Sequence, residues 1–223
     1  YLLAIFKGAG HLFQMFLSIP YEAGVGVTLI IVMLYTSVGG FVSVVRTDVL
    51  QGVLMLLGSV VIFFFVTQAA GGVTSISALR AIPEKQFLFE LNGGIPFAVL
   101  LGVSLSGSLK LLSDPRQLSR FYALKDEAAV RRGKWIATLG LAIVLSCLFP
   151  VGIYTHLILP EVTDTDLIVP SLVSDPSVFP LWASDFLIIA ILAAAMSSMD
   201  SVLLVAASTL YRNVVAPFST SSR

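Results

Sequence analysis

The stretch Val49–Leu79, which reads VLQGVLMLLGSVVIFFFVTQAAGGVTSISAL, decides the fold class because it contains no charged residue. A helix needs about 20 consecutive apolar residues to cross a hydrocarbon core of about 30 Å, and this stretch is longer. Further long runs occupy Ala23–Val45, Leu91–Leu109, Trp135–Pro160 and Phe186–Tyr211, and only the last is interrupted by a charge, at Asp200. Repeated runs of this length leave too few charged faces for a large soluble helical core.

The overall composition points to the same class of protein. Only 12% of residues are charged, against about 25% in ordinary globular domains, and the mean hydropathy is +0.97. The net charge is zero and no basic stripe suggests a nucleic-acid partner. Cys147 is the single cysteine, which rules out a disulfide within the chain and a multi-cysteine metal site.

We therefore predict an all-α integral membrane protein, surrounded by lipid, with five full transmembrane helices and one partial helix. The partial helix precedes Ser18, and the full helices cover about 21–41, 47–70, 95–120, 133–159 and 181–214. Short helical pieces are predicted at 74–81 and, beginning near Thr165-Asp166, in the loop before the last helix. The sequence starts abruptly in apolar residues without the features of a signal peptide. We expect residues 1–223 to form a single transmembrane domain that is incomplete at both ends.

The distribution of charge predicts the orientation of these helices. Basic residues cluster around the connection between the helices at 95–120 and 133–159, namely Arg116, Arg120, Lys125, Arg131, Arg132 and Lys134. Cytoplasmic loops are enriched in Lys and Arg, so the loop at about 121–133 is expected in the cytoplasm. The loop at about 160–181 carries acidic residues and no basic one, and it is expected outside.

Polar residues in the last predicted helix are candidates for ion binding, because polar groups at membrane depth are costly and often functional. Ser197 and Ser198 offer hydroxyl oxygens, and Ala194 lies on the same helical face as Ser197. Hydroxyl and carbonyl oxygens can replace the water shell of a small cation. Alternatively, these small residues simply form a packed helix interface. Asp200 is interpreted either as a support for the ion region or as a group facing an inner aqueous vestibule.

The helix predicted at 95–120 is interrupted, and its polar residues are candidates for lining a substrate site. Ser104, Gly107 and Ser108 precede Lys110, and proline follows Asp114. Proline disfavours helical backbone at the residue before it, and broken helices are where secondary transporters hold their substrates. Lys110 can pair with Asp114 at i+4, extend toward the inner interface, or face a substrate carboxylate.

The predicted turn between the helices at 21–41 and 47–70 contains two glycines and an acid. Thr47 or Asp48 can cap the second of these helices, and Gln51 is a weaker polar signal. No nucleophile–base pair or phosphate-binding loop is present in the sequence, so an enzyme is not expected.

Four short strings resemble the sodium:solute symporter family, in the order in which its members carry them. They are Tyr35-Thr36-x-x-Gly39-Gly40 followed by Thr47-Asp48-x-x-Gln51, then Asp114-Pro115-Arg116, the loop Pro160–Pro170, and Ala193–Ser198 with Asp200-Ser201. The loop resembles that of the pantothenate-transporting branch. The resemblance covers nearly the whole chain.

The resemblance implies an inverted-repeat transporter core of five plus five helices, of which this chain holds the third to the eighth. It implies that Ala194, Ser197 and Ser198 bind Na⁺ as coupling ion, with the remaining ligands on helices outside this chain. It assigns Asp48 to cation coupling, with Asp200 as a further candidate, and it places the helix around Lys110 at the substrate. Lys110 itself departs from sugar- and proline-carrying members, which favours an organic anion. A bacterial inner membrane is the implied location.

We therefore expect a symporter that uses the Na⁺ gradient to move a small solute by alternating access. The solute is an organic anion, a vitamin such as pantothenate, or an amino acid. The alternative is a symporter-like sensor module attached to a signalling domain elsewhere in the protein. The sequence of the full gene would separate the two.

Overall fold

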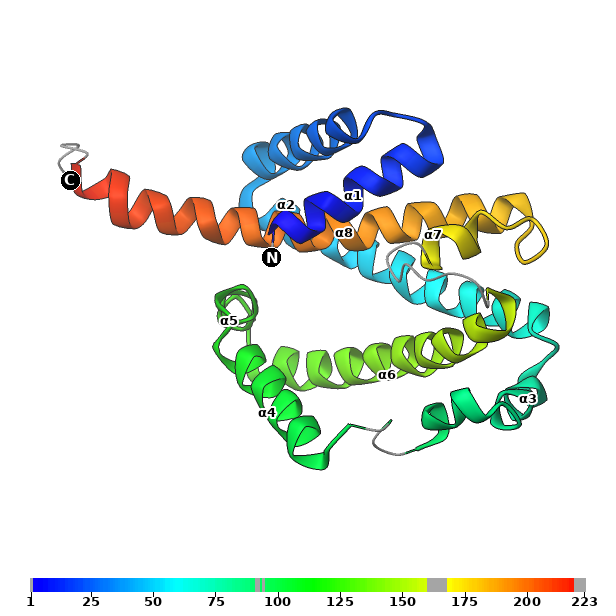
Figure 1. Cartoon of the computed structure of the whole chain (residues 1–223). Coiled ribbons are helices and arrows are strands. Elements are labelled where there is room, and N and C mark those ends of the chain that lie inside the picture. Colours follow the sequence, from blue (N-terminus) through cyan, green and yellow to red (C-terminus); the bar gives the residue numbers. More distant parts are fainter. Residues whose placement is uncertain (1, 91–92, 94, 160–167, 219–223) are drawn as a thin grey trace. The chain divides into compact units, whose positions relative to one another are not determined.

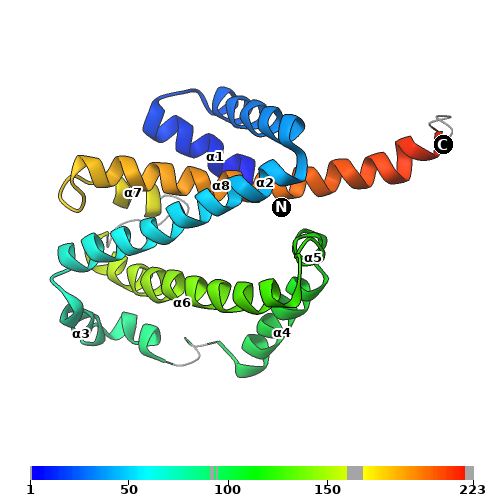
Figure 2. The same cartoon turned by 180° about the vertical axis from the view of Figure 1, so that it is seen from behind.

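In a computed structural model of the chain, the structure describes residues 2–90, 93, 95–159 and 168–218, and every regular element in these ranges is helical. Figures 1 and 2 show the helices from opposite sides. This confirms the predicted all-α class. The chain divides into two compact units, Tyr1–Met55 with Ile188–Arg223, and Leu56–Leu187. Each unit is described by itself.

The first unit begins with two helices that pack closely through glycine. Helix α1 (Leu2–Leu17) and the start of α2 (Tyr21–Ala69) run side by side (Figures 1 and 2). A Cβ atom built on Gly10 would lie 2.6 Å from the ring of Tyr21, and one on Gly24 would lie 2.5 Å from Cβ of Phe13. Small residues allow such close approach of helices in membranes, where van der Waals packing drives association.

Helix α8 (Leu181–Leu210) completes the core of the first unit. Ala9 of α1, Val32 of α2 and Met199 of α8 are fully buried against one another. Half-buried side chains, among them Tyr35 and Met196, pack around this cluster. The core therefore joins α1 and the first part of α2 to the middle of α8.

Helix α2 is sharply broken at Gly40, where φ is 56° and ψ is −149°. We call residues 21–39 the first arm and residues 41–69 the second arm. Backbone angles in this region are essentially confined to glycine. At Gly39 the limit is steric, because a Cβ atom there would lie 2.0 Å from Cβ of Ser43. The glycine pair thus serves two purposes: Gly40 turns the backbone, and Gly39 makes room for the next helical turn.

The break is shorter than the sequence predicted. We expected a turn extending to about residue 47, with Thr47 or Asp48 capping the next helix, and both expectations are wrong. The helix resumes directly after Gly40, so both residues lie inside it. The Thr47 hydroxyl donates back to the carbonyl oxygens of Ser43 and Val44, at 3.1 and 2.9 Å. Asp48 is therefore available for a role other than capping.

The second unit contains two long apolar helices and several short ones. After α2 come η1 (Val73–Ser75), α3 (Ile76–Arg80), η2 (Pro83–Phe89), α4 (Phe97–Ser113), α5 (Pro115–Tyr122), α6 (Glu127–Ile158) and α7 (Ile168–Val173). The predicted helical piece at 74–81 is confirmed by η1 and α3. Helix α7 confirms the piece before the last helix, although its expected start at Thr165-Asp166 and the rest of 160–167 lie outside the described residues.

Helix α6 begins earlier than predicted because Asp126 caps it. The Asp126 carboxylate accepts a hydrogen bond of 2.7 Å from the backbone amide of Ala129. An acidic N-cap satisfies a helix amide that would otherwise lack a partner. The connection between α5 and α6 is therefore short, and the basic residues expected in a cytoplasmic loop at 121–133 lie partly on the first turns of α6.

Contacts within the second unit hold α6 and the end of α2 to the short elements. The Tyr154 hydroxyl of α6 donates to the carbonyl oxygen of Val73 at 3.4 Å. Nζ of Lys85 lies 3.1 Å from Nδ1 of His156. The ring of Phe65 stacks against Phe179 and Trp182, with centroids 5.7 Å apart in each case.

Among the described residues, three helices are long and apolar enough to cross a membrane: α2, α6, and the helix from Leu181 to Phe218. Helices α4 and α5, bent by 46° at Asp114, form a fourth candidate if they are taken as one span. The two arms of α2 correspond to two of the predicted spans. Their lengths of about 28 and 43 Å, at 1.5 Å per residue, are each close to or above the thickness of a hydrocarbon core.

Candidate functional site

The predicted ion-binding residues of α8 lie in an unbroken stretch of helix. Ala194, Ser197 and Ser198 are all half-buried, on a helix that stays regular from Leu181 to Leu210. The Ser201 hydroxyl donates to the carbonyl oxygen of Ser197 at 2.8 Å. The helix is regular around Ala194, which can offer an ion only its backbone carbonyl oxygen, whereas Ser197 and Ser198 offer side-chain hydroxyls.

Ser197 joins α8 to the second arm of α2 through a short hydrogen bond. Its hydroxyl donates to Oδ1 of Asp48 at 2.7 Å. A hydroxyl bonded to a carboxylate forms a charge-assisted hydrogen bond, which is stronger than a neutral one. The structure thus brings together two residues that the sequence singled out independently, one for sodium binding and one for cation coupling.

Asp200 joins α8 to the first arm of α2. Its side chain has no exposed surface. Oδ2 accepts a hydrogen bond of 2.7 Å from the Tyr35 hydroxyl, and Oδ1 accepts one of 2.8 Å from the backbone amide of Ser201. Both donors stabilise the ionised carboxylate. Of the two interpretations for Asp200, this burial favours support of the ion region over exposure to an aqueous vestibule.

Gln51 connects these two hydrogen-bonded pairs and contributes an unused acceptor. It lies one helical turn from Asp48 on α2, is only 7% exposed, and interacts through its side chain with Tyr35. Its Oε1 atom has no hydrogen-bond partner among the described residues. Buried polar atoms are nearly always paired, so an orphaned one points to a missing ion or water. We call Tyr35, Asp48, Gln51, Ser197 and Asp200 the polar cluster.

The chemistry of the polar cluster suits a small hard cation. Its oxygens come from two carboxylates, an amide and two hydroxyls, and Ser198 adds a further hydroxyl on the adjacent position of α8. In the part of the chain that the structure describes, no three His, Cys, Asp or Glu residues gather as they would for a transition metal. Oxygen ligands without thiolate or imidazole favour alkali or alkaline-earth ions.

The candidate substrate residues lie in the second unit, on α4. Ser104, Gly107, Ser108 and Lys110 are all exposed. The serine and glycine residues do not interrupt the helix, as the Ser108 hydroxyl donates to the carbonyl oxygen of Ser104 at 2.8 Å. The predicted interruption occurs only at Asp114-Pro115.

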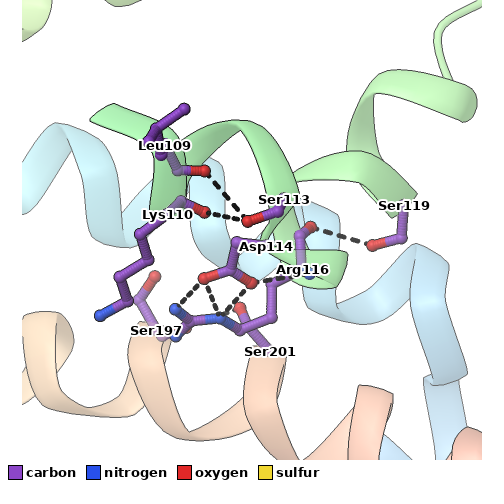
Figure 3. A network of polar contacts seen from close by, with 8 residues as sticks. All are labelled: Leu109, Lys110, Ser113, Asp114, Arg116, Ser119, Ser197 and Ser201. Carbon is purple, nitrogen blue, oxygen red and sulfur yellow. Dashed lines mark hydrogen bonds and ion pairs between the residues drawn. The ribbon is translucent and has the colours of Figure 1, made fainter. Parts of the chain in front are cut away.

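Asp114 shapes that interruption through its neighbour rather than through Lys110 (Figure 3). Oδ1 accepts hydrogen bonds from the backbone amide and Nε of Arg116, at 3.0 and 2.9 Å, and the two side chains form an ion pair. The carboxylate therefore caps α5. Lys110 exerts a smaller attraction on the same carboxylate. The expected i, i+4 pair is thus secondary, and the turn is set by Arg116.

Sequence reasoning missed the roles of Tyr35 and Gln51. Both residues stand in the strings that carry the family resemblance, but neither had an assigned function. The available signal was Asp200, because a carboxylate in an apolar helix needs a donor from another helix. The sequence alone did not show which of the polar residues on distant helices would supply it.

Comparison with known proteins identifies the family. The family model described as "Sodium:solute symporter family" matches residues 1–221. The chain belongs to this family. Among its curated relatives, the sodium/pantothenate symporters of Haemophilus influenzae and Escherichia coli are 27% and 30% identical to it over 211 residues, with 94% of this chain and 43% of each relative covered.

A third relative carries a different solute by name. The osmoregulated proline transporter OpuE of Bacillus subtilis is 31% identical over 215 residues, with 94% of this chain and 42% of that protein covered. This chain therefore spans less than half the length of these relatives. No solved structure matches it significantly.

Membership of the family confirms three predictions made from the sequence. The chain is part of an integral membrane protein, its family transports solutes with sodium, and it is not an enzyme. Which solute it serves, and which residues bind it, are matters for the proposal that follows.

Proposed function

We propose that the full-length protein is a sodium-coupled symporter that moves a small solute by alternating access, and that this chain carries much of its ion-coupling apparatus. The observation that carries the proposal is the hydrogen bond of 2.7 Å between Ser197 and Asp48. It joins a hydroxyl of the small-residue stretch of α8 to a carboxylate on α2, beside a buried amide oxygen for which the described residues supply no hydrogen-bond partner. The membership of the symporter family supports the same function.

In this proposal, Ala194, Ser197 and Ser198 provide the α8 side of a sodium site, and helices outside this chain provide the remaining ligands. The hydroxyl oxygens of Ser197 and Ser198 replace part of the water shell of the ion, without the full cost of a buried charge. Asp48 and Asp200 supply negative charge beside the site. Each carboxylate accepts a hydrogen bond from a hydroxyl, Asp200 from Tyr35 and Asp48 from Ser197.

The solute site belongs to α4 in this proposal. It is lined by Ser104, Gly107, Ser108 and Lys110. Asp114 shapes the break between α4 and α5. A solute with a carboxylate, such as pantothenate or an amino acid, would meet the ammonium of Lys110. The curated relatives include symporters named for pantothenate and for proline, which are both carboxylates. Radiolabelled pantothenate and proline are therefore the first solutes to test, followed by a counterflow screen of other carboxylates.

We also propose the topology expected from the sequence. The two arms of α2 cross the membrane separately, which with α4–α5, α6 and α8 makes five spans beside the partial span α1. The connection at 121–133 faces the cytoplasm of a bacterium. Both compact units belong to one transporter domain, which forms part of a core of five plus five helices.

The test uses the full-length protein in proteoliposomes and measures solute uptake against Na⁺ concentration. The double variant Ser197→Ala with Ser198→Ala should raise the Na⁺ concentration for half-maximal uptake by about tenfold or more, equivalent to losing about 1.4 kcal/mol of binding. Ser208→Ala is the matched control, because this serine lies on the same helix, is exposed, and donates back to the carbonyl oxygen of Val205 in its own helix. Unchanged Na⁺ dependence of solute uptake in the double variant would contradict the assignment of Ser197 and Ser198 to the sodium site.

A further inference from the structure

The two arms of α2 are each tied to α8 by one of the hydrogen bonds described above, on opposite sides of the break at Gly40. Tyr35 of the first arm donates to Asp200, and Asp48 of the second arm accepts from Ser197, both at 2.7 Å. Asp200 and Ser197 stand three residues apart on α8, which is about one helical turn. One short segment of α8 therefore holds both arms.

The joint between the arms is governed by the backbone rather than by packing. A Cβ atom built on Gly40 would meet nothing within 4 Å. Its backbone angles interrupt the helical pattern at a single residue. Hinges in proteins are a few residues that absorb a change of φ and ψ without disturbing the elements beside them. Gly40 meets this description in its backbone, and the Gln51 side chain of the second arm, which interacts with Tyr35 of the first arm, would adjust when the angles of Gly40 change.

The first arm is firmly attached to α8. Val32 and Met199 are fully buried together, and the Tyr35 ring packs against this cluster. The bond from Tyr35 ends on a carboxylate with no exposed surface. Breaking this attachment would remove one of the donors to a buried carboxylate, which is costly. The first arm and α8 therefore move as one body.

The attachment of the second arm through Ser197 is different in kind, because the donor is shared with the proposed sodium site. A serine hydroxyl has one hydrogen and two lone pairs. When its hydrogen points at Asp48, its lone pairs point elsewhere and can contact a cation. A cation on the lone pairs polarises the hydroxyl and strengthens its donation to the carboxylate. Without the cation, the hydroxyl can instead turn toward a carbonyl one turn back on its own helix, as serine hydroxyls often do.

We propose that Gly40 is a hinge and that the Ser197–Asp48 hydrogen bond transmits sodium occupancy from α8 to the second arm of α2. This inference rests on the proposed sodium site. Asp48 is then a positioning residue that senses the ion through the Ser197 hydroxyl, and the Tyr35–Asp200 pair is the fixed reference. Sodium favours the conformation in which the second arm is hydrogen-bonded to α8. The size of this preference cannot exceed the difference between the sodium-binding free energies of the two conformations.

Spin labels on the full-length protein test this arrangement. Cys147 and any other native cysteine are replaced, and labels are placed at Leu34→Cys and Val53→Cys, one exposed site on each arm. A control pair, Leu34→Cys with Leu210→Cys, joins the first arm to the exposed end of α8. Pulsed electron resonance then measures both distances with Na⁺ and with choline, while ²²Na⁺ binding is measured in parallel.

We expect Na⁺ to change the distance between the arms and to leave the control distance unchanged. Asp48→Leu should abolish the change between the arms and lower Na⁺ affinity by about tenfold, the size of a typical coupling. Asp48→Asn keeps an oxygen that can accept the hydrogen bond, so it should retain most of the change. If Asn behaves as Leu does, Asp48 acts through its charge, and the positioning role is wrong.

Three further outcomes distinguish a failure of the hinge, or of its hydrogen bond, from a failure of the proposed symporter function. If Na⁺ binds and drives uptake but the distance between the arms does not change, the hinge is wrong and the symporter proposal stands. If the change persists in Asp48→Leu, the hydrogen bond is not the transmitter. If Na⁺ neither binds nor drives uptake in the unmodified protein, the proposed function itself fails.

Discussion

The Tyr35 hydroxyl lies 2.7 Å from Oδ2 of Asp200, a carboxylate with no exposed surface, on a helix 165 residues further along the chain. A buried carboxylate that loses a donor keeps its desolvation cost without compensation. This contact therefore explains how a charged residue is tolerated in an otherwise apolar stretch of α8. It also makes the phenol of Tyr35 a structural requirement, which can be tested directly.

Tyr35→Phe removes the hydroxyl and keeps the ring. We expect it to destabilise the protein by about 1.5–3 kcal/mol, the usual worth of a hydrogen bond to a charged group. The measurement is thermal unfolding of the full-length protein in detergent. Tyr211→Phe is the control, because Tyr211 directly follows α8 and is 60% exposed, and the unfolding temperature of this variant should not change. A Tyr35→Phe variant as stable as the parent would show that other donors suffice for Asp200.

Gly40→Ala tests the backbone at the break. The added methyl group meets no neighbour, so any loss of stability must come from the positive φ, at about 1–3 kcal/mol. Gly26→Ala is the matched control, since it also has open space but lies in ordinary helix within the first arm. There alanine should stabilise the helix by up to about 1 kcal/mol. Equal effects of the two substitutions on unfolding temperature would refute the argument.

Gly39→Ala tests close packing at the neighbouring position. Its new Cβ atom would lie 2.0 Å from Cβ of Ser43, so we expect poor folding and a reduced yield of monodisperse protein. Ser43→Gly removes the obstructing atom and should restore folding in the double variant, although it weakens the helix by itself. Such compensation between contacting residues appears as non-additivity in a double-mutant cycle. Additive losses would mean that the clash is not the cause.

Lys110→Gln tests the proposed contact with a substrate carboxylate. We expect uptake of pantothenate and other anions to fall by about tenfold or more, while ²²Na⁺ binding stays within about twofold, because the ion site is on other helices. Lys134→Gln, which removes a charge from the first turns of α6, controls for the change in net charge and should leave uptake unchanged. Parallel loss of anion uptake and sodium binding would assign Lys110 to structure or coupling instead.

Much of the helical plan could be read from the sequence, because apolar runs and proline are local signals. The interruption at Asp114-Pro115 and the last helix from Leu181 agree with the structure. The early start of α6 was missed, since its first turns are charged and apolarity alone does not find them. The acidic pair Asp126-Glu127 was the available signal, as acids favour helix N-termini.

The site was predicted in its parts but not in its connections. Asp48, Ser197 and Asp200 were each singled out as polar residues at membrane depth, and the structure brings them into one cluster. The pairing of Tyr35 with Asp200 has no counterpart in local spacing, because it depends on how α2 turns at Gly40. A single glycine sets that turn, and no proline follows it until Pro83.

The length of α6 has a consequence for where the helix sits in its membrane. Its 32 residues extend about 48 Å, which exceeds a hydrocarbon core of about 30 Å. In the proposed topology α6 crosses the membrane, and the extra length, which includes the charged first turns from Glu127 to Lys134, lies among lipid headgroups. Each basic residue near an anionic leaflet is attracted by about 1 kcal/mol. The depth of α6 is therefore set by the surface potential of the leaflet as well as by hydrophobic thickness, and it should change with lipid composition.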